Sequence, residues 1–242
     1  MTVSQYTAIA KTYVDIKDHD AADRVAIFPT FLDQFGDVRG QSIAEFFCGE
    51  GRAGRALLAR GAGHIVGIDK DPVMLAEAKQ RPVAHTEYRQ GPVGQLGQIG
   101  LFDAIACPWA FHYAASEPEL FNMFRDAAVN LKRGGVCVVL NNNPERTLGG
   151  TKRIGFISRS DDDPLVDGSP IIVTIYGKGK SASFTTHHWS LETYQAAARA
   201  AGLSLTLVPF RITHEGRVEM GEDWCREFET NICSCIFVCR HL

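Results

Sequence analysis

A glycine-rich turn between a strand-like run and a helix-like run is the strongest constraint in this sequence. Residues 45–56 read EFFCGEGRAGRA and contain a complete G-x-G-x-x-G at Gly49, Gly51 and Gly54. An acidic residue, Asp69, follows the first glycine by about twenty positions. Glycines at such a turn let the backbone bend sharply and let a ligand approach the start of the next helix closely. The pattern predicts a nucleotide-type ligand at the end of the first strand of an α/β sheet.

Strand-like and helix-like patterns alternate on both sides of this turn, which is typical of a mostly parallel sheet covered by helices on both faces. The helix that begins at the capping box formed by Ser116 and Glu119 is expected to end at Gly134 and Gly135. Strands are predicted at 41–48, 64–69, 85–91, 101–108 and 136–142, and helices at 52–61, at 72–80 and from 116 onward.

The chain changes character after residue 143. A Gly-, Ser- and Asp-rich stretch is followed by strand-like runs at 171–177 and 182–189, which the turn-forming KGKS joins, so an inserted β-hairpin is predicted. A helix at 190–202, a strand at 203–209, a helix near 222–229 and a last, antiparallel strand at 233–239 are expected to follow. We expect one domain over 1–242, with a helical cap at 1–40, a ligand-binding core at 41–143, the insert at 144–189 and a completing segment at 190–242.

Charge and hydropathy exclude several classes of partner. The 242 residues carry 25 basic and 28 acidic side chains, with the basic ones scattered, which argues against a nucleic acid or an acidic membrane surface as partner. No window approaches the roughly 18 consecutive apolar residues of a membrane span, and the first residues lack the pattern of a signal peptide. We therefore expect a cytoplasmic protein.

The cysteines are expected to be reduced and buried. There are seven, an odd number, and none forms a C-x-x-C pair. Cys233, Cys235 and Cys239 share one face of the last predicted strand, where apolar neighbours favour core packing over a metal site. We expect no metal.

Acidic residues around the glycines distinguish two kinds of ligand. Glu45 lies late in the first strand, and Glu50 lies between the first two glycines. A dinucleotide brings phosphate and gains nothing from negative charge there, whereas S-adenosylmethionine brings a sulfonium and an ammonium group. Asp69 suits ribose hydroxyls in either case. The negative charges of Glu45 and Glu50 therefore favour S-adenosylmethionine over a dinucleotide.

Several segments resemble motifs of the class I S-adenosylmethionine-dependent methyltransferases: IAEFFCGEGRAG, VGIDKDPVMLAEAK, FDAIACPWAFHYA and LKRGG. The resemblance implies a Rossmann-like fold, a mostly parallel seven-stranded sheet whose last strand is antiparallel. QYTAIAKTYVD, FTTHHWSLETYQAAARAAG and EDWCREFETN are similar to segments of the toxoflavin synthase-like small-molecule N-methyltransferases. That narrower resemblance implies N-methylation of a nitrogen heterocycle, toxoflavin- or azapteridine-like, in an antibiotic pathway, with QYTAIAKTYVD closing over the cofactor.

The resemblance also implies contacts to S-adenosyl-L-methionine and to its product, S-adenosyl-L-homocysteine. Asp69 would bind the ribose, and Arg24 the methionine carboxylate. Pro92 stands where these families usually place an aspartate that binds the adenine amino group, so backbone groups near Gly91 and Val93 are expected to frame the base instead. The residues expected to contact the cofactor are Tyr13, Arg24, Glu45, Gly49, Gly51, Asp69, Lys70, Met74, Gly91, Pro92, Val93, Cys107 and Pro108.

Residues beyond the cofactor strands are expected to bind the methyl acceptor, because aromatic and amide side chains suit a flat heteroaromatic ring. Those residues are Trp109, Asn141, Tyr176, His188 and Trp189. Methyl transfer is an in-line displacement that requires alignment, and it requires a general base only where the acceptor keeps its proton. The candidate catalytic groups are His112, Tyr113 and His187. Trp189 equally suits the core, and His112 a hydrogen-bonding role at a helix start.

Other functions stay open at this point. O-methylation of a small acid or phenol is the nearest alternative to N-methylation. An NAD-dependent oxidoreductase and a non-catalytic cofactor-binding module are alternatives of other classes. The pattern does not separate a monomer from a homodimer.

Overall fold

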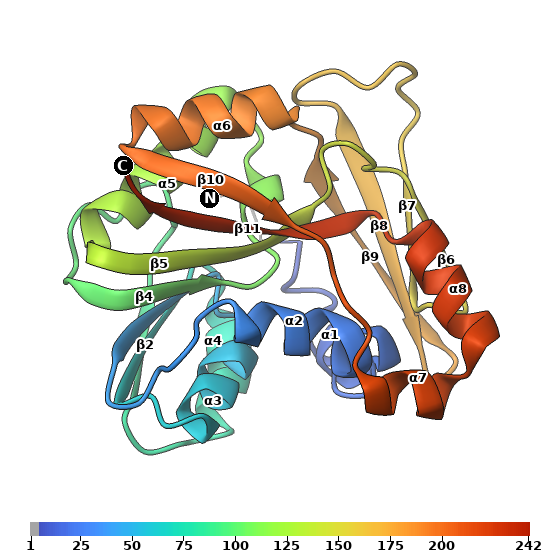
Figure 1. Ribbon diagram of the computed structural model, residues 1–242, viewed down its shortest axis with the longest axis horizontal. Helices are drawn as coiled ribbons and strands as arrows, with labels where there is room; N and C mark the ends of the chain where they lie inside the picture. Colours follow the sequence, from blue (N-terminus) through green and yellow to red (C-terminus); the bar gives the residue numbers. More distant parts are fainter. Residues whose placement is uncertain (1–4) are drawn as a thin grey trace.

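A seven-stranded sheet in the order β10-β11-β5-β4-β1-β2-β3 forms the body of the molecule in the computed structural model, which describes residues 5–242 (Figure 1). β11 runs antiparallel to both of its neighbours, and the other strands run parallel to one another, which confirms the predicted fold class. The strands are β1 Ser42–Phe46, β2 His64–Asp69, β3 Thr86–Gln90, β4 Phe102–Cys107, β5 Leu131–Asn142, β10 Leu203–Val208 and β11 Ser234–His241.

Helices cover both faces of this sheet. α5 (Glu117–Asn130) and α6 (Leu191–Ala200) pack on one face, and α2 (Phe28–Asp33), α3 (Arg52–Ala59) and α8 (Glu222–Asn231) pack on the other (Figure 1). Because both faces are buried, the central strands are continuous apolar runs rather than alternating ones. α4 (Pro72–Lys79) follows β2, and the Asp71 side chain caps it by accepting from Val73 N–H and Met74 N–H.

The end of α5 and the start of β5 differ from the prediction. α5 ends at Asn130 rather than at Gly134 and Gly135, because Leu131 is already extended and pairs with Phe102 of β4. The predicted capping box does not form: Ser116 makes no side-chain cap, and Glu119 accepts from Ala115 N–H at 2.8 Å, one residue before the N-cap. A short helix, α7 (His214–Met220), was not predicted.

The insert is larger than the predicted hairpin. It is a separate antiparallel sheet in the order β6-β7-β8-β9, and β8 and β9 are the expected hairpin. Lys178 and Gly179 connect them with positive φ angles of 50° and 72°, as a tight two-residue hairpin turn requires. The strands are β6 Gly149–Thr151, β7 Phe156–Arg159, β8 Pro170–Gly177 and β9 Lys180–His187.

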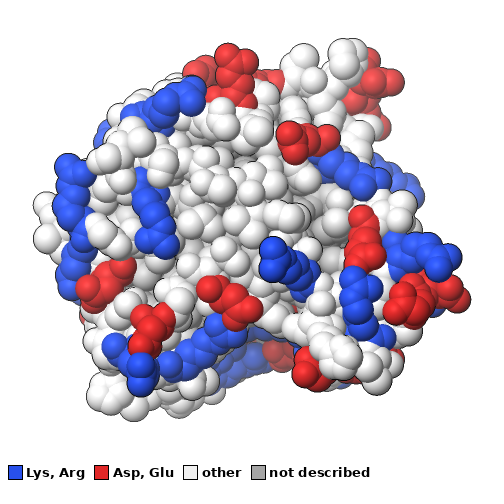
Figure 2. Space-filling view, viewed as in Figure 1, with Lys and Arg blue, Asp and Glu red and all other residues white. Residues whose placement is uncertain are grey.

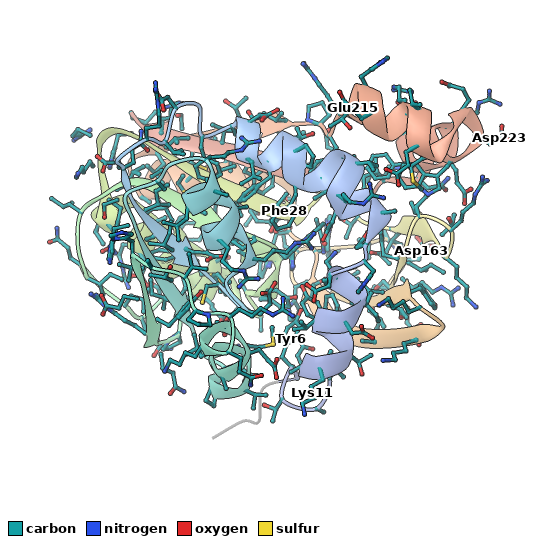
Figure 3. All side chains as sticks on the ribbon, turned by 90° about the horizontal axis from the view of Figure 1, so that it is seen from below. Tyr6, Lys11, Phe28, Asp163, Glu215 and Asp223 are labelled. Atoms are coloured by element: carbon teal, nitrogen blue, oxygen red, sulfur yellow. The ribbon has the colours of Figure 1, made fainter. Side chains whose placement is uncertain are left out.

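The N-terminal segment lies between the two sheets. α1 (Ala10–Lys17) packs against β8 and β9, and a π-helical turn at Asp23–Ile27 leads into α2. Figure 3 shows Tyr6 and Phe28 on this segment, which separates the main sheet from the insert. Gln5 fastens the segment to β9, since its side chain accepts from Thr185 N–H at 2.8 Å and donates to Thr185 C=O at 2.9 Å.

Charged side chains of both signs are mixed on the surface. Figure 2, in the view of Figure 1, shows basic side chains interspersed with acidic ones, mostly around the rim of the visible face.

The cysteines do not form disulfides. All seven cysteines are buried and free, including Cys233, Cys235 and Cys239. In the described part of the chain, no group of three or more His, Cys, Asp or Glu side chains is arranged to hold a metal ion. Within residues 5–242, no helix is both long and apolar enough to cross a membrane.

Candidate active site

The glycine turn joins β1 to α3, and its glycines are needed for different reasons. Gly49 and Gly51 have φ angles of 53° and 77°, in the left-handed region that favours glycine, and Gly51 is the N-cap residue of α3. A Cβ on Gly54 would lie 2.6 Å from Glu45 Oε2, so this glycine lets α3 lie close against β1. The predicted turn therefore forms with the geometry that its sequence implies.

Asp69, at the end of β2, holds this turn in place. Its Oδ2 accepts from Gly49 N–H at 2.8 Å, and its Oδ1 accepts from Asp71 N–H at 2.9 Å. Burial raises the pKa of the Asp69 carboxyl, while these two N–H groups favour its charged form. Each oxygen has further lone pairs, so the carboxylate can also accept hydrogen bonds from a ligand's hydroxyls.

Glu45 and Glu50 differ in how far their charges are neutralised. Glu45 is fully buried on β1, and its Oε1 accepts from Ala53 N–H at 3.1 Å. Its Oε2 has no hydrogen-bond partner among residues 5–242, and burial raises the pKa of the carboxyl to about 8. Glu50 forms ion pairs with Arg55 and Arg81. Glu45 is therefore the acid with an oxygen still available to a ligand.

A first cavity opens where β1, β2 and β4 end at their carboxyl ends, which is where open α/β sheets bind ligands. A second hollow, at the end of β3, shares Asp69, Lys70 and Tyr113 with it. The predicted cofactor residues that line the first cavity are Tyr13, Glu45, Gly49, Asp69, Lys70, Met74 and Pro108. Gly91, Pro92 and Val93 line the hollow beside β3.

Three predicted cofactor residues, Gly51, Arg24 and Cys107, do not line the cavities described above. Arg24 is half exposed and forms an ion pair with Glu219 of α7 at 2.5 Å, so in this structure it is engaged away from the first cavity. Cys107 is fully buried in the sheet, with its Sγ 4.0 Å from Cys137 Sγ, and does not line a cavity.

Lys17 and Arg52, which the sequence did not single out, line the first cavity beside Asp23. Lys17 Nζ lies 2.6 Å from Asp20 and 2.7 Å from Asp23, and Arg52 lies 2.8 Å from Asp23. Burial opposes the charge on Lys17, but the two carboxylates outweigh it and raise the pKa of the ammonium. Lys17 therefore stays cationic beside the cavity.

A further cavity, here called the insert cavity, lies between the N-terminal segment, the end of β5 and the insert. It shares Tyr13, Lys17 and Trp109 with the first cavity. The residues lining it that were not predicted include Asp20, Phe156, Ser158, Phe184 and Ser234. They come from separate elements whose strand-like patterns carry no sign of a site.

Trp109 and His112 are the predicted acceptor and catalytic residues that line the insert cavity. His112 is buried, and its Nδ1 accepts from Asn142 N–H at 3.2 Å. Burial lowers the pKa of His112 to about 3, so the ring is neutral and carries its proton on Nε2. The neutral His112 ring thus has its Nδ1 engaged and its remaining proton on Nε2, which favours a hydrogen-bond donor over a general base.

Tyr113 lies at the first cavity, where its hydroxyl and that of Tyr6 form a hydrogen bond. Burial raises the pKa of Tyr113 well above its ordinary value, so the phenol stays protonated. His187 is not among the residues that line the three cavities described above. It is half-buried on β9, and burial lowers its pKa. Tyr113 thus joins the N-terminal segment to the wall of the first cavity, whereas His187 lies outside the linings of all three.

The other predicted acceptor residues have structural roles. Asn141 Oδ1 accepts from His112 N–H at 2.9 Å. His188 Nδ1 pairs with Thr147 Oγ1 at 2.7 Å, away from the cavities. Trp189 is in the core and donates from Nε1 to the Ala114 carbonyl at 3.1 Å. Tyr176 lies outside the cavities too, beneath Lys152, whose Nζ is 5.4 Å from the ring centroid.

Comparisons with known proteins agree with this geometry. Residues 43–135 match the family model described as a methyltransferase domain. An S-adenosylmethionine-dependent methyltransferase from Mesorhizobium loti superposes with a TM-score of 0.66 at 19% identity, covering 93% of this chain and 99% of that chain. The chain has the Rossmann-like fold of the class I methyltransferases.

Other proteins with this methyltransferase fold are also similar. The sugar N-methyltransferase KedS8 from Streptoalloteichus superposes with a TM-score of 0.60 at 22% identity, covering 93% of this chain and 88% of that chain. The ubiquinone biosynthesis O-methyltransferase of Acinetobacter baylyi is 30% identical over 121 residues, 47% of this chain and 49% of the relative. The chain spans about half the length of the curated relatives that it matches.

Proposed function

We propose that this protein is an S-adenosyl-L-methionine-dependent methyltransferase that acts on a small molecule. The observation that carries the proposal is a pair of adjacent cavities that share Tyr13, Lys17 and Trp109 in their walls. One ligand in each cavity would bring two reactants together at these side chains. Methyl transfer needs this kind of arrangement, since most of its acceleration comes from alignment of two bound molecules.

The first cavity fits S-adenosyl-L-methionine in charge and in hydrogen bonding. Asp69 has lone pairs for the ribose hydroxyls, and the Glu45 carboxyl, which keeps its proton below about pH 8 without a ligand, would release it on pairing with the ammonium group. Lys17 and Arg52 take the place of Arg24 as partners for the methionine carboxylate. When bound, the cofactor supplies an electrophilic methyl group on a sulfonium centre.

The adenine would lie in the hollow beside β3, framed by Gly91, Pro92 and Val93. Backbone groups replace the side-chain acceptor that Pro92 lacks. The product of the reaction is S-adenosyl-L-homocysteine.

The insert cavity favours N-methylation of a flat nitrogen heterocycle of the kind found in antibiotic pathways. Trp109, Phe156 and Phe184 provide aromatic walls on which such a ring can stack. O-methylation of a small phenol or acid is the second candidate. The similarity to ubiquinone biosynthesis O-methyltransferases favours it, and the same walls suit a phenol.

Calorimetric titration with S-adenosyl-L-homocysteine, with NADH titrated in parallel, tests the cofactor assignment. We expect saturable binding of the first ligand and none of the second. Binding of NADH alone would refute the proposal and support the oxidoreductase alternative. Product formation from a panel of heterocycles and phenols, detected by mass spectrometry, then separates an enzyme from a non-catalytic binding module.

A matched pair of variants tests the cation assignment. Arg52→Gln is expected to weaken binding of S-adenosyl-L-homocysteine about tenfold, or ~1.4 kcal/mol. Arg24→Gln should leave the affinity unchanged, because Arg24 pairs with Glu219 away from the cavity. Thermal unfolding of both variants checks that they fold. A larger loss of affinity in the Arg24 variant would contradict the assignment.

A further inference from the structure

The insert cavity has hydrogen-bond donors available to a ligand. Trp109 Nε1 is buried and has no hydrogen-bond partner within residues 5–242. His112 Nδ1 already accepts from Asn142 N–H, which leaves Nε2–H as the donor of the neutral ring. A buried N–H without a partner is costly, so a ligand that brings a lone pair to Trp109 Nε1–H gains most from that group, and His112 Nε2–H is a second donor of the same lining.

The carboxylate at the same cavity is already engaged, and the unpartnered Ser234 hydroxyl that also belongs to the lining is uncharged. Asp20 is the carboxylate among the described residues that line it. Asp20 Oδ1 accepts from Asp23 N–H at 3.2 Å, and Oδ2 accepts from Lys17 Nζ at 2.6 Å. An ammonium ligand would need a carboxylate free to pair with it. The cavity therefore disfavours a cationic amine as the methyl acceptor.

The described lining residues also offer no free base. The low pKa of His112 keeps the ring neutral, and its remaining nitrogen carries a proton. Lys17 is held as an ammonium by its two aspartates and cannot accept a proton. An acceptor whose reacting atom still bears a proton would have no group here to remove it.

We propose that the methyl acceptor binds as an anion, a deprotonated nitrogen heterocycle or phenol whose charged edge faces Trp109 Nε1–H and His112 Nε2–H. The inference rests on the proposed function and adds the ionisation state of the acceptor. The acceptor loses its proton to water before it binds. Its lone pair then forms the bond to the methyl carbon while the cofactor's carbon–sulfur bond breaks and leaves its electron pair on sulfur. An anion and a sulfonium thus become two neutral products.

A chromogenic acid, 4-nitrophenol, tests the inference on the full chain saturated with S-adenosyl-L-homocysteine, because its phenol and phenolate absorb at different wavelengths. We expect the bound probe to have a pKa at least one unit below that of the free probe, which corresponds to a tenfold preference for the phenolate. A bound probe with an unchanged or raised pKa would overturn the inference. Failure of the probe to bind at millimolar concentration would also overturn it.

Substitutions at Trp109 and His112 test whether these two N–H donors cause the preference for phenolate. Trp109→Phe keeps an aromatic wall but removes Nε1–H, so the preference for phenolate should fall at least threefold. His112→Gln should lower it too. Tyr176→Phe, on the insert but outside the cavity, is the matched control and should keep the full preference. An unchanged preference in both donor variants would overturn the donor assignment. Saturation with S-adenosyl-L-homocysteine is measured first, so failure of the cofactor proposal is seen separately.

Discussion

Glu45→Gln is the substitution whose effect on stability follows most directly from the structure. Glu45 is fully buried, and one N–H group of α3 and one unpartnered oxygen define its surroundings. Burial raises the pKa of its carboxyl from an ordinary 4.5 to about 8. Glutamine keeps the shape of the side chain and its acceptor oxygen but has no titrating proton.

The sign of the effect comes from proton binding. Between pH 4.5 and about pH 8, the unfolded chain has released the Glu45 proton while the folded protein retains it. The free energy of unfolding therefore falls as pH rises through this window, and this contribution is constant above it. At ~1.4 kcal/mol per pH unit, the whole window amounts to about 5 kcal/mol. Because glutamine does not titrate, Glu45→Gln does not lose this stability as pH rises.

Urea unfolding at pH 5, 6.5 and 8 measures the difference between the two proteins. We expect Glu45→Gln to be close to the wild type at pH 5 and more stable by several kcal/mol at pH 8. Glu215→Gln, at an exposed position, is the control and should follow the wild type at every pH. If the unfolding free energies of the wild type and Glu45→Gln changed with pH in the same way, the assignment of a buried, protonated carboxyl would be refuted.

Three further substitutions have definite expected outcomes. His112→Gln should reduce the fall in unfolding free energy between pH 6.5 and about 3, because over that range His112 of the wild type is protonated in the unfolded chain but not in the folded protein. Circular dichroism during an acid titration measures the difference. Asp69→Ala should weaken binding of S-adenosyl-L-homocysteine by about 1–3 kcal/mol in calorimetry, and an unchanged affinity would remove Asp69 from the site. Gly54→Ala should cost about 1–3 kcal/mol in unfolding free energy, because its Cβ would meet Glu45 Oε2 and Ile65 Cγ2; a wild-type melting temperature would contradict this close packing.

The main sheet could be predicted from the sequence because its signals are local. β2 begins and ends at the predicted residues, since an apolar run with a clear end at Asp69 forms a buried parallel strand. β6 and β7 were missed because Gly149 and Gly150 give no strand pattern, and these residues join a sheet only through pairing with Ser158 and Ile157. Local pattern thus predicted the sheet that positions the cofactor and only half of the insert.

In the candidate site, too, residues close together in the sequence could be predicted and residues from distant segments could not. Glu45, Gly49 and Asp69 lie within one strand–turn–helix unit and the strand beside it, so their spacing predicted their meeting. Arg24 and Arg52 are both arginines near predicted helices, and only the packing of the N-terminal segment places Arg52 at the cavity and Arg24 beside Glu219. The walls of the insert cavity come from distant parts of the chain, which no local pattern connects.

The separation of the two sheets has a consequence for how such a protein can diversify. Among the described residues, β6 to β9 form ladder hydrogen bonds only with one another, so side chains of the insert can be exchanged without breaking the main sheet. Glu45 and Asp69 have no such freedom, because each also holds the backbone of the glycine turn or of the helix that follows it. If the proposed sites are correct, substitutions disturb the fold little on the wall proposed to bind the acceptor and strongly on the wall proposed to bind the cofactor, so one scaffold can change its substrate while it keeps its methyl donor.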